Sequence, residues 1–539
     1  TARERLVQTI EVVLDRLSSA YIPMLVFLED LHWVSSESLS LLQHLQSELS
    51  TLPILIVGSY RNDETPNLPK ELPSAQLITL NRMSLLETAE LCKAILGDKI
   101  AQPALVNMLH QATSGNAYFL IETIRSLAEE SGSLDQISPE RTQSKRMLIS
   151  NNLQSVIKYR LDKLSLSDYR LLELAAVMGR EINLDAMNHF TNDTARWVLA
   201  CADVAVLEWF EDRWRFSHDK FRDYILSQFS SNDLREAHEQ VAKALEKFTT
   251  GQEALLAYHW GISGNTEKEQ HYTLLAGEQA VSNSAGKEAI GYLMRVLEIG
   301  NLSPYKQAHV HFQLALAHYS IANLQLSLDH SHQSLKALKI HLAKRSIGVV
   351  RSILFQLAQQ FLPILRKASG YQRYPQEHLR LAVKVSVHMS QVLFFAGKRL
   401  ETVQVAFLAG NLAEHTGKTP ELLRAYSIVS YVYVSIALYR MSERYSQKTL
   451  AIIEDIEDIS ARAFAYLVLG LYFASIGKLA TAQNYFMLAF NLFDEIGDHR
   501  RRREALAMVS LVTTLMGHLV EGKKHRMRLQ EISLRSNDI

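Results

Sequence analysis

The segment Met24–Trp33 reads Met-Leu-Val-Phe-Leu-Glu-Asp-Leu-His-Trp, in which five apolar residues run directly into two adjacent carboxylates. An unbroken apolar run of this length predicts a strand buried on both faces, as in a parallel sheet. Open α/β sheets bind their ligands at the carboxyl ends of the strands, which is where Glu29 and Asp30 lie. Paired acids at that position can hold hydrated Mg²⁺ against nucleotide phosphates and polarise a water. The alternative is a core strand that ends in two solvated acids.

The sequence on either side of this segment extends the same pattern. A second apolar run, Ile54–Tyr60, ends in Arg61, and a helical pattern separates the two runs. Another helical stripe is predicted over residues 1 to about 19. Strand, helix and strand in this order predict a parallel crossover unit, which brings Arg61 to the same sheet edge as Glu29 and Asp30. We therefore expect a phosphate and metal site there, against the alternative that Arg61 is a surface residue on a loop.

Composition limits the class of protein. The chain has 539 residues, enough for roughly three to five domains. It is 47% hydrophobic and 21% charged, and its 57 basic residues equal its 57 acidic ones, so no global field favours nucleic acid or an anionic membrane. Two cysteines, Cys92 and Cys201, exclude a disulfide framework and fit a reducing compartment. Without a secretion signal or an apolar stretch long enough to span a bilayer, we expect a cytoplasmic fragment of a longer protein.

Four segments together resemble a known family. Leu25–Trp33 and Gly58–Arg61 are similar to the Walker B and sensor 1 segments of STAND-class P-loop ATPases, the AAA-like regulatory ATPases of bacterial signalling proteins. Leu80–Ser84, with Glu87, resembles the link that leads into the helical lid of that family. Ser114–Glu122 resembles its glycine-asparagine-proline-aromatic segment, although Ala117 stands where the family usually has proline.

The resemblance implies roles for individual residues. Glu29 would hold Mg²⁺ through water, and Asp30 would be the catalytic or water-orienting acid. Arg61 would sense the γ-phosphate of ATP, and Asn116 matches the nucleotide-binding segment. His32 and Trp33 are expected to pack beneath the site. The departure at Ala117 weakens the expectation of adenine recognition.

One element of that family is absent from the 539 residues. No segment reads G-x-x-x-x-G-K-[ST], the loop whose backbone amides and lysine cradle the phosphates. In the family this loop precedes Walker B by many tens of residues, so we expect it before Thr1. ATP and Mg²⁺ are accordingly expected as cofactors only together with that upstream loop, and this chain alone should neither bind ATP well nor hydrolyse it.

A polar linker at residues 130–150 is expected to lead into a winged-helix module at 151–232. Leu174–Ile182 resembles the start of that module, and Leu207–Phe216 predicts a two-stranded wing. Phe216–Arg222 then matches a recurrent Phe-x-His-Asp-x-x-Arg signature. In related proteins a histidine of this module reaches the nucleotide, which makes His218 a candidate; the alternative is a histidine that caps or packs the following helix. Acidic residues offset the arginines of the module, so direct DNA binding is not expected.

Residues 233–539 are helical throughout and contain recurring hairpins. The clearest unit spaces Leu469-Gly470, Phe473, Gly477, Ala482, Phe486 and Ala489 in the small-large pattern of a tetratricopeptide-type repeat. Gly397-Lys398 precedes Gly477-Lys478 by 80 residues, or two periods of about 40, and Tyr439-Arg440 is assigned to the turn between them. Ala276-Gly277 with Leu293 gives an earlier copy. Such arrays bind protein partners, with self-association as a further option; the alternative is an irregular helical bundle.

Two further groups of residues carry charge or potential metal ligands. Five histidines occur close together in the sequence, at positions 309, 311, 318, 330 and 332. Spacings of two place such side chains on different helix faces, so a shared metal ion is not expected. The basic run His499–Arg503 is interpreted as a solvated helix start rather than a nucleic-acid patch.

The predicted architecture is multidomain, α/β followed by all-α. It comprises half a P-loop ATPase sheet (1–80), a helical lid with linker (81–150), the winged-helix module (151–232) and a tetratricopeptide-like solenoid (233–539). The resemblance implies a nucleotide-dependent signalling switch, fused in the longer protein to an output domain such as a class III cyclase or a serine/threonine kinase. Two alternatives stay open: a scaffold with a degenerate ATPase remnant, and a LuxR-type transcription activator.

Overall fold

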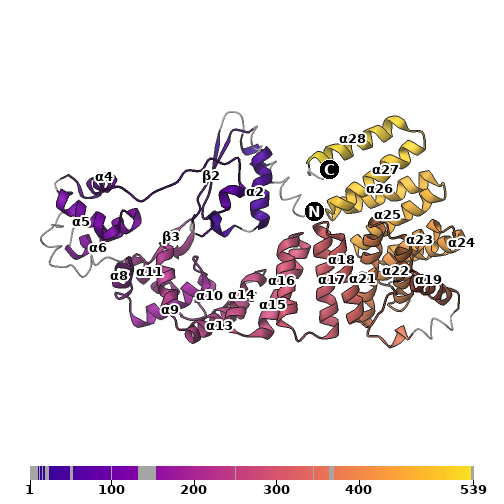
Figure 1. Ribbon diagram of the computed structural model, residues 1–539, viewed down its shortest axis with the longest axis horizontal. Helices are drawn as coiled ribbons and strands as arrows, with labels where there is room; N and C mark the ends of the chain where they lie inside the picture. Colours follow the sequence, from indigo (N-terminus) through magenta and orange to yellow (C-terminus); the bar gives the residue numbers. More distant parts are fainter. Residues whose placement is uncertain are drawn as a thin grey trace. The chain divides into compact units, whose positions relative to one another are not determined.

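The computed structural model describes residues 10, 13–14, 16–18, 23–34, 36–48, 52–62, 64–98, 100–131, 153–248, 251–343, 345–362 and 370–535 (Figure 1). Residues Ala75–Tyr272 form one compact unit, and the described residues on either side of it form the other. Most of the predicted first helix and almost all of the predicted linker at 130–150 lie outside the described residues.

The predicted crossover unit is present. Strand β1 (Met24–Leu28), a short 3-10 helix η1 (Leu31–Trp33), helix α2 (Ser36–Glu48) and strand β2 (Ile54–Gly58) follow in that order, and the short helix α3 (Leu68–Glu71) comes next. The strands pair in parallel, with Met24 opposite Ile54 and Leu28 opposite Gly58. The parallel pairing confirms that the residues after β1 and β2 leave from the same edge.

The prediction that this sheet is buried on both faces is wrong. Four large side chains alternate onto one exposed face: Leu25, Phe27, Leu55 and Val57, with Phe27 65% exposed. The side chains between them, beginning with Met24 and Ile54, are half-buried. A crossover helix covers one face of a strand pair, and burial of the second face needs further elements. An unbroken apolar run shows that the side chains on both faces of a strand are apolar. It does not show that other elements pack on both faces.

Three helices follow: α4 (Leu85–Leu96), α5 (Pro103–Thr113) and α6 (Ala117–Ser131). Ser84 and Glu87, which the sequence analysis placed in the link to the lid, begin α4 with a reciprocal capping box. The helices share an apolar core that includes Leu105, Leu109 and Leu120. The predicted helical segment after the sheet is therefore present.

The next helices surround a β-hairpin. They are α8 (Leu153–Leu161), α9 (Leu166–Met178), α10 (Leu184–Met187), α11 (Thr194–Asp203), α12 (Asp219–Ser227), α13 (Ser231–Phe248) and α14 (Glu253–Ser263). Strands β3 (Leu207–Phe210) and β4 (Arg213–Phe216) pair antiparallel, which confirms the predicted hairpin. Glu181 adds an isolated antiparallel bridge to Arg215. The hairpin thus packs into a helical core through Leu207 and Phe216, both of which are buried.

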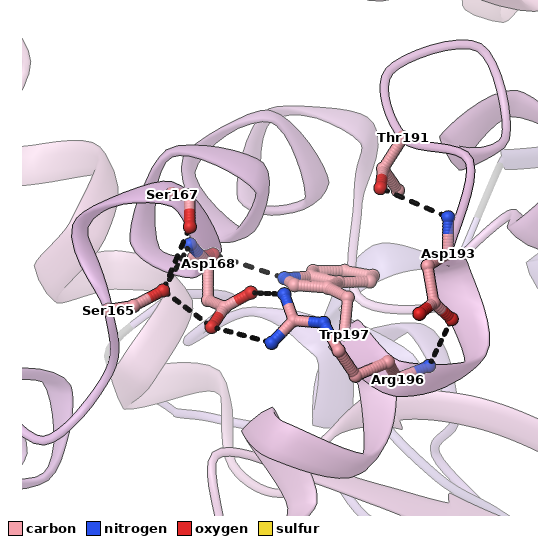
Figure 2. A network of polar contacts seen from close by, with 7 residues as sticks. All are labelled: Ser165, Ser167, Asp168, Thr191, Asp193, Arg196 and Trp197. Atoms are coloured by element: carbon pink, nitrogen blue, oxygen red, sulfur yellow. Dashed lines mark hydrogen bonds and ion pairs between the residues drawn. The ribbon is translucent and has the colours of Figure 1, made fainter.

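A polar network fixes α9 against α11 inside this core (Figure 2). The buried Asp168 accepts hydrogen bonds from Ser165 Oγ (2.6 Å) and from Arg196 Nη2 (2.5 Å). Trp197, which is fully buried, donates from Nε1 to the Asp168 carbonyl at 3.1 Å. Burial favours the protonated acid, but the hydrogen bonds from Ser165 and Arg196 outweigh it and lower the pKa of Asp168. All these groups satisfy one another, so the network serves the fold.

The described residues that follow α14 form a series of helices (Figure 1). They are α15 (Thr266–Ser282), α16 (Gly286–Ile299), α17 (Pro304–Ser320), α18 (Leu324–Ala337), α19 (Ser346–Phe361), α21 (Gln376–Phe395), α22 (Arg399–Ala413), α23 (Pro420–Ser435), α24 (Tyr439–Ile452), α25 (Ile459–Ser475), α26 (Leu479–Glu495), α27 (His499–Leu515) and α28 (Leu519–Arg535), with 3-10 helices η4 (Tyr371–Arg373) and η5 (Ile453–Asp455). Most of these helices pack on a helix that is close to them in the chain, and residues from Ala308 to Val512 share one long apolar core. A smaller core joins α15, α16 and α17 through Ala280, Leu293 and Leu314.

A period of 40 residues runs through the last hairpins. Gly397, Ala437, Gly477 and Gly517 occupy the same turn with φ of 71°, 62°, 79° and 86°. The assignment of Tyr439-Arg440 to this turn is wrong by two residues, because Tyr439 already begins α24. Ala437 adopts the left-handed conformation that glycine adopts at the other three turns. Because the residue there is alanine, a search for glycine did not locate this turn.

Small residues allow the paired helices to approach, as the repeat pattern predicts. A Cβ atom added at Gly470 would lie 2.5 Å from the Phe486 ring, and one added at Gly277 would lie 2.8 Å from the Leu293 side chain. In each case the large residue follows the glycine by sixteen positions. The two hairpins therefore share one packing rule despite the distance between them in the chain.

Two further expectations can be compared with the described residues. Cys92 and Cys201 are both free and buried. No helix in the described part of the chain is both long and apolar enough to cross a bilayer.

Candidate functional site

The carboxyl edge of the β1–β2 pair is built from residues just beyond the two strands. Asp30 adopts a left-handed conformation (φ 56°, ψ 43°), which turns the chain sharply into η1. Its backbone N–H donates to Ser59 Oγ at 3.1 Å, while Leu31 N–H donates to the Ser59 carbonyl at 2.8 Å. Gly58 permits this approach, since a Cβ there would lie 2.4 Å from Leu31 Cδ1. Left-handed non-glycine residues are strained and cluster at functional sites.

His32, just after β1, contacts the backbone of Arg61, just after β2. The Arg61 N–H lies 3.4 Å from His32 Nδ1, and the His32 side chain is fully buried. Glu64 contacts both residues, at 2.8 Å from Arg61 Nη1 and 3.6 Å from His32 Nε2. The expectation that His32 packs beneath the edge is confirmed. Trp33 departs from it, because this side chain is 57% exposed, although its ring centre lies 4.7 Å from that of His32.

The residues at this edge fit a hydrated Mg²⁺–nucleotide in part. Glu29 is exposed and Asp30 is half-buried, and carboxylate oxygens are the ligands that Mg²⁺ takes, usually with several waters retained. Among the described residues, no three histidine, cysteine, aspartate or glutamate side chains form a metal cage. A site at Glu29 and Asp30 would therefore depend on water and phosphate oxygens for the remaining ligands. The guanidinium of Arg61 lies at the same edge, 31% exposed.

Asn116 has a structural role at the start of α6. Its Oδ1 accepts a hydrogen bond from the Phe119 N–H at 2.9 Å, as N-cap residues do. The preceding Gly115 has φ 71° and exchanges close backbone contacts with Met83, whose N–H donates to the Gly115 carbonyl at 2.8 Å. A Cβ at Gly115 would lie 2.2 Å from the Met83 carbonyl oxygen. The predicted link and the predicted nucleotide-binding segment thus meet backbone to backbone.

His218 caps α12. Its Nδ1 accepts a hydrogen bond from the Lys220 N–H at 3.1 Å, so the alternative of a capping histidine is confirmed. The other residues of the Phe216–Arg222 signature are likewise used: Phe216 is buried, Asp219 pairs with Arg180 at 3.4 Å, and Arg222 Nε donates to the Ala176 carbonyl at 2.8 Å. The signature therefore holds α12 to the hairpin and to α9.

Tyr118 joins two of the predicted segments. Its ring stacks on His218 with centroids 3.7 Å apart and an interplanar angle of 25°. Burial, and then the negative charge of Glu122, raise the pKa of the Tyr118 phenol above its usual value. Because Tyr118 lies two residues after Asn116, the structure brings the Asn116 and His218 segments together within one compact unit.

A buried ion pair lies beside this stack. Arg160 on α8 pairs with Glu122 on α6, and the two side chains are only 2% and 8% exposed. Arg160 also donates from Nη1 to the Ala205 carbonyl at 3.3 Å, and its guanidinium carbon lies 5.9 Å from the centre of the Phe221 ring. Paired buried charges of this kind hold elements in one register and are costly to break.

Several residues of these contacts could not be recognised as functional candidates from the sequence. Ser59, Glu64, Tyr118 and Glu122 each lie inside or next to a segment that resembles the STAND family. Arg160 carried a weak signal, because it lies on the apolar side of α8 between Ile157 and Leu161. Its partner could not be read from the sequence, since ion pairing across helices depends on the fold.

His309 and His311 of α17 have different partners, as their spacing of two predicts, but His311 and His318 both contact His330 of α18. His309 pairs with Glu278 at 2.6 Å, whereas His311 Nδ1 lies 3.1 Å from His330 Nδ1. His318 stacks on His330 with ring centroids 5.2 Å apart. Burial, and then the charge of His330, lower the pKa of His311 to about 4. Burial is also the main cause that lowers the pKa of His318 and of His330, so the rings of His311, His318 and His330 pack together in the neutral form.

Known proteins resemble this chain only in fold, and only partly. No protein-family model matches the chain, and no curated protein matches it. The fold is similar to that of a Signal Transduction ATPase with Numerous Domains (STAND) protein with a tetratricopeptide repeat sensor from Pyrococcus horikoshii, at 13% identity and a TM-score of 0.48, over 99% of this chain and 78% of that one.

A second likeness is to the Saccharomyces cerevisiae separase–securin complex, at 12% identity and a TM-score of 0.28, over 93% of this chain and 35% of that one. With both TM-scores below 0.5, neither likeness establishes what this chain does.

Proposed function

We propose that this chain is the regulatory segment of a nucleotide-dependent signalling switch, in which an ATP site at the β1–β2 edge is coupled to a protein-binding array of helical repeats. The observation that carries the proposal is the parallel pairing of β1 and β2, which delivers Glu29, Asp30 and Arg61 to one sheet edge. Acids beside an arginine at that edge suit a metal–phosphate ligand.

Each residue has a task in this proposal. Glu29 and Asp30 would hold Mg²⁺ through water, and Asp30 would orient the water that attacks the γ-phosphate. Bound Mg²⁺ would neutralise charge on the phosphate oxygens. Arg61 would exchange its contact with Glu64 for a phosphate oxygen, so that Glu64 sets the resting position of the guanidinium. The phosphate-binding loop would come from sequence outside these 539 residues.

Coupling would run through the unit formed by Ala75–Tyr272. The Tyr118–His218 stack and the Glu122–Arg160 ion pair tie α6 to α8 and α12, so α6 cannot shift without disturbing both contacts. By its resemblance, the longer protein would carry a cyclase or kinase output domain.

A scaffold without ATPase activity is the second candidate. It is favoured by the structural use of the predicted nucleotide residues: Asn116 caps α6, His218 caps α12, and Arg61 contacts Glu64. In a scaffold, these contacts are the whole role of the three residues. The repeats would then act alone as the protein-binding part.

The test uses the full-length protein with Mg²⁺. We expect wild type to bind ATP, and Asp30→Asn to keep binding while turnover falls by about 100-fold. Glu71→Gln is the matched control, because Glu71 is an exposed carboxylate on α3, in the same compact unit as β1 and β2, and has no proposed role in binding or hydrolysis.

Equal turnover in wild type and Asp30→Asn would remove Asp30 from the chemistry. Absence of ATP binding by wild type at millimolar concentration would leave the scaffold as the function. Arg61→Ala, measured in parallel, should weaken ATP binding more than ADP binding if Arg61 meets the γ-phosphate.

A further inference from the structure

The start of α27 contacts helices that precede it by more than a hundred residues. Arg500 Nη2 donates to the Tyr319 hydroxyl of α17 at 2.5 Å, across 181 positions of sequence. Arg501 Nη2 donates to Gln391 Oε1 of α21 at 3.3 Å. The repeat array therefore turns back so that α17, α21 and α27 meet. His499–Arg503 does begin a helix, and Arg500 is exposed to solvent as expected, but Arg500 and Arg501 also contact helices far away in the chain.

Aromatic rings support both guanidinium groups. The Arg500 guanidinium carbon lies 4.4 Å from the centre of the Tyr319 ring and 5.9 Å from that of Phe395. Arg501 lies 4.8 Å from the Phe464 ring centre. Stacked guanidinium groups keep their N–H donors at the rim of the plane, where a carboxylate can take two of them at once.

The charges around the two arginines leave Arg500 uncompensated. Arg501 has Asp498 at 3.7 Å, Arg424 has Asp458 at 3.5 Å, and Lys384 has Glu421 at 3.3 Å. Over the part of the chain that the structure describes, no carboxylate lies within 4.0 Å of the Arg500 guanidinium. Arg500 itself is exposed. A cation on an aromatic support, open to solvent, is placed to meet an incoming anion.

The titratable neighbours report positive potential at this place. Burial, and then the charge of Arg501, lower the pKa of the Arg424 guanidinium. Burial, and then Arg501, also lower the pKa of His388 to about 4, with Arg500 adding to the effect and a hydrogen bond at Ala315 opposing it. Because the whole chain carries no net charge, this potential is local.

Exposed apolar side chains adjoin the cation. Phe394 and Phe395, at the end of α21, are 56% and 53% exposed, and their ring centres lie 5.7 Å apart. Large aromatic side chains beside an arginine are the composition of energetically dominant protein-binding sites. The combination favours a peptide that carries carboxylates next to an apolar residue over a small inorganic anion.

We propose that Arg500 and Arg501, with the aromatic support of Tyr319 and Phe395, form a binding site for an acidic segment of a partner protein. A carboxylate of that segment pairs with the N–H donors of Arg500, and a neighbouring apolar side chain packs on Phe395. This deepens the protein-binding part of the proposed function by naming the chemistry of the partner, and it does not depend on the ATP site.

The test measures anisotropy of two fluorescein-labelled peptides, Glu-Glu-Leu-Glu-Glu-Glu and its lysine counterpart, with the full-length protein. Wild type should bind the acidic peptide, more weakly as salt rises, and should not bind the lysine peptide. Arg500→Gln keeps an N–H donor for Tyr319 but removes the charge, and it should weaken binding by about tenfold or more.

Arg526→Glu is the control, because Arg526 is an exposed arginine on α28 and its reversal changes net charge by more than Arg500→Gln does. It should alter the affinity by less than about twofold. Thermal unfolding of Arg500→Gln separates loss of the site from loss of the array: an unchanged midpoint with lost binding supports the proposal.

Three results would overturn it: no binding of the acidic peptide by wild type, equal weakening by Arg500→Gln and Arg526→Glu, or undiminished binding by Arg500→Gln. Tighter binding of single-stranded oligothymidylate than of the acidic peptide would assign the arginines to nucleic acid instead. None of these results bears on ATP binding, so the two proposals fail independently.

Discussion

The two-stranded sheet and the helical repeats contain the same kinds of apolar side chain, with opposite burial. Phe27 in β1 is 65% exposed, whereas Phe486 in α26 is fully buried under the turn of helix that contains Gly470. In the last repeats, each hairpin is followed after 40 residues by another of the same pattern, so the inner apolar faces pack on a neighbour. A strand pair with one crossover helix has a neighbour for one face only. Whether an apolar side chain is buried here thus depends more on the presence of a neighbouring repeat than on the hydrophobicity of the side chain.

The same substitution at both sites gives the largest expected contrast. Phe486→Ala should destabilise the protein by about 3–5 kcal/mol, because it leaves a cavity in a closed core. Phe27→Ala should change stability by less than about 0.5 kcal/mol, since little contact is lost. Chemical denaturation with hydrogen exchange of each segment measures both. A loss at Phe27 as large as that at Phe486 would mean that another part of the protein covers this face.

Charged groups extend the comparison to ion pairs. Glu122→Gln leaves Arg160 charged and buried, and should cost about 3 kcal/mol, with faster hydrogen exchange across α6. Glu181→Gln breaks the Arg213 pair, whose side chains are 67% and 60% exposed, and should cost less than about 1 kcal/mol. Similar losses at the two sites would show that burial does not govern these pairs.

Acid should weaken the buried histidine pair of α13 and α14. Burial is the main cause that lowers the pKa of His238 to about 4 and that of His259 to about 3, and their Nδ1 atoms lie 2.8 Å apart. Both folded-state pKa values lie below the unfolded value, so the unfolded chain binds more protons below about pH 6.5. The stability is complete above that pH and is lost as the pH falls toward 4.

The expected slope is about 2–2.5 kcal/mol per pH unit between pH 6 and 5, because two histidines contribute, and denaturation at a series of pH values measures it. The double variant His238→Leu, His259→Leu should flatten it, while His271→Gln, at an exposed position of α15, should not. A slope that persists in the double variant would assign the acid sensitivity to other groups.

The turn at Ala437 gives the smallest expected effect and the sharpest test of the 40-residue period. Ala437→Gly should stabilise the array by up to about 1 kcal/mol, because φ 62° is unfavourable for alanine. Gly477→Ala, at the equivalent turn, should destabilise it by a similar amount. Thermal unfolding midpoints compare the two variants. Opposite signs support equivalence of the turns; a loss in both would show that the turn at 437 differs.

Much of the local structure could be predicted from the sequence. The apolar runs at 24–28 and 54–58 became parallel strands, the capping box of Ser84 and Glu87 began a helix, and Gly470 packed against Phe486. These features depend on residues close together in the chain, or on a period that repeats. The candidate residues at the sheet edge followed from the same logic, because parallel strands end at one edge.

Other features depended on contacts between distant residues. Ala437 adopts a left-handed backbone conformation, which alanine does not favour, because the helices on either side of the turn impose it. Asn116 and His218 proved to be helix caps, and the contacts of Tyr118 with His218 and of Glu122 with Arg160 join different segments.

The sequence by itself determined the strands, the helices and the spacing of the repeats, because backbone preference and apolar periodicity act over a few residues. Only the tertiary structure decided which faces are covered, that Glu122 meets Arg160, and that Arg500 meets Tyr319 across 181 positions. Such contacts depend on how whole elements pack, and the same local pattern is compatible with a covered face or an open one.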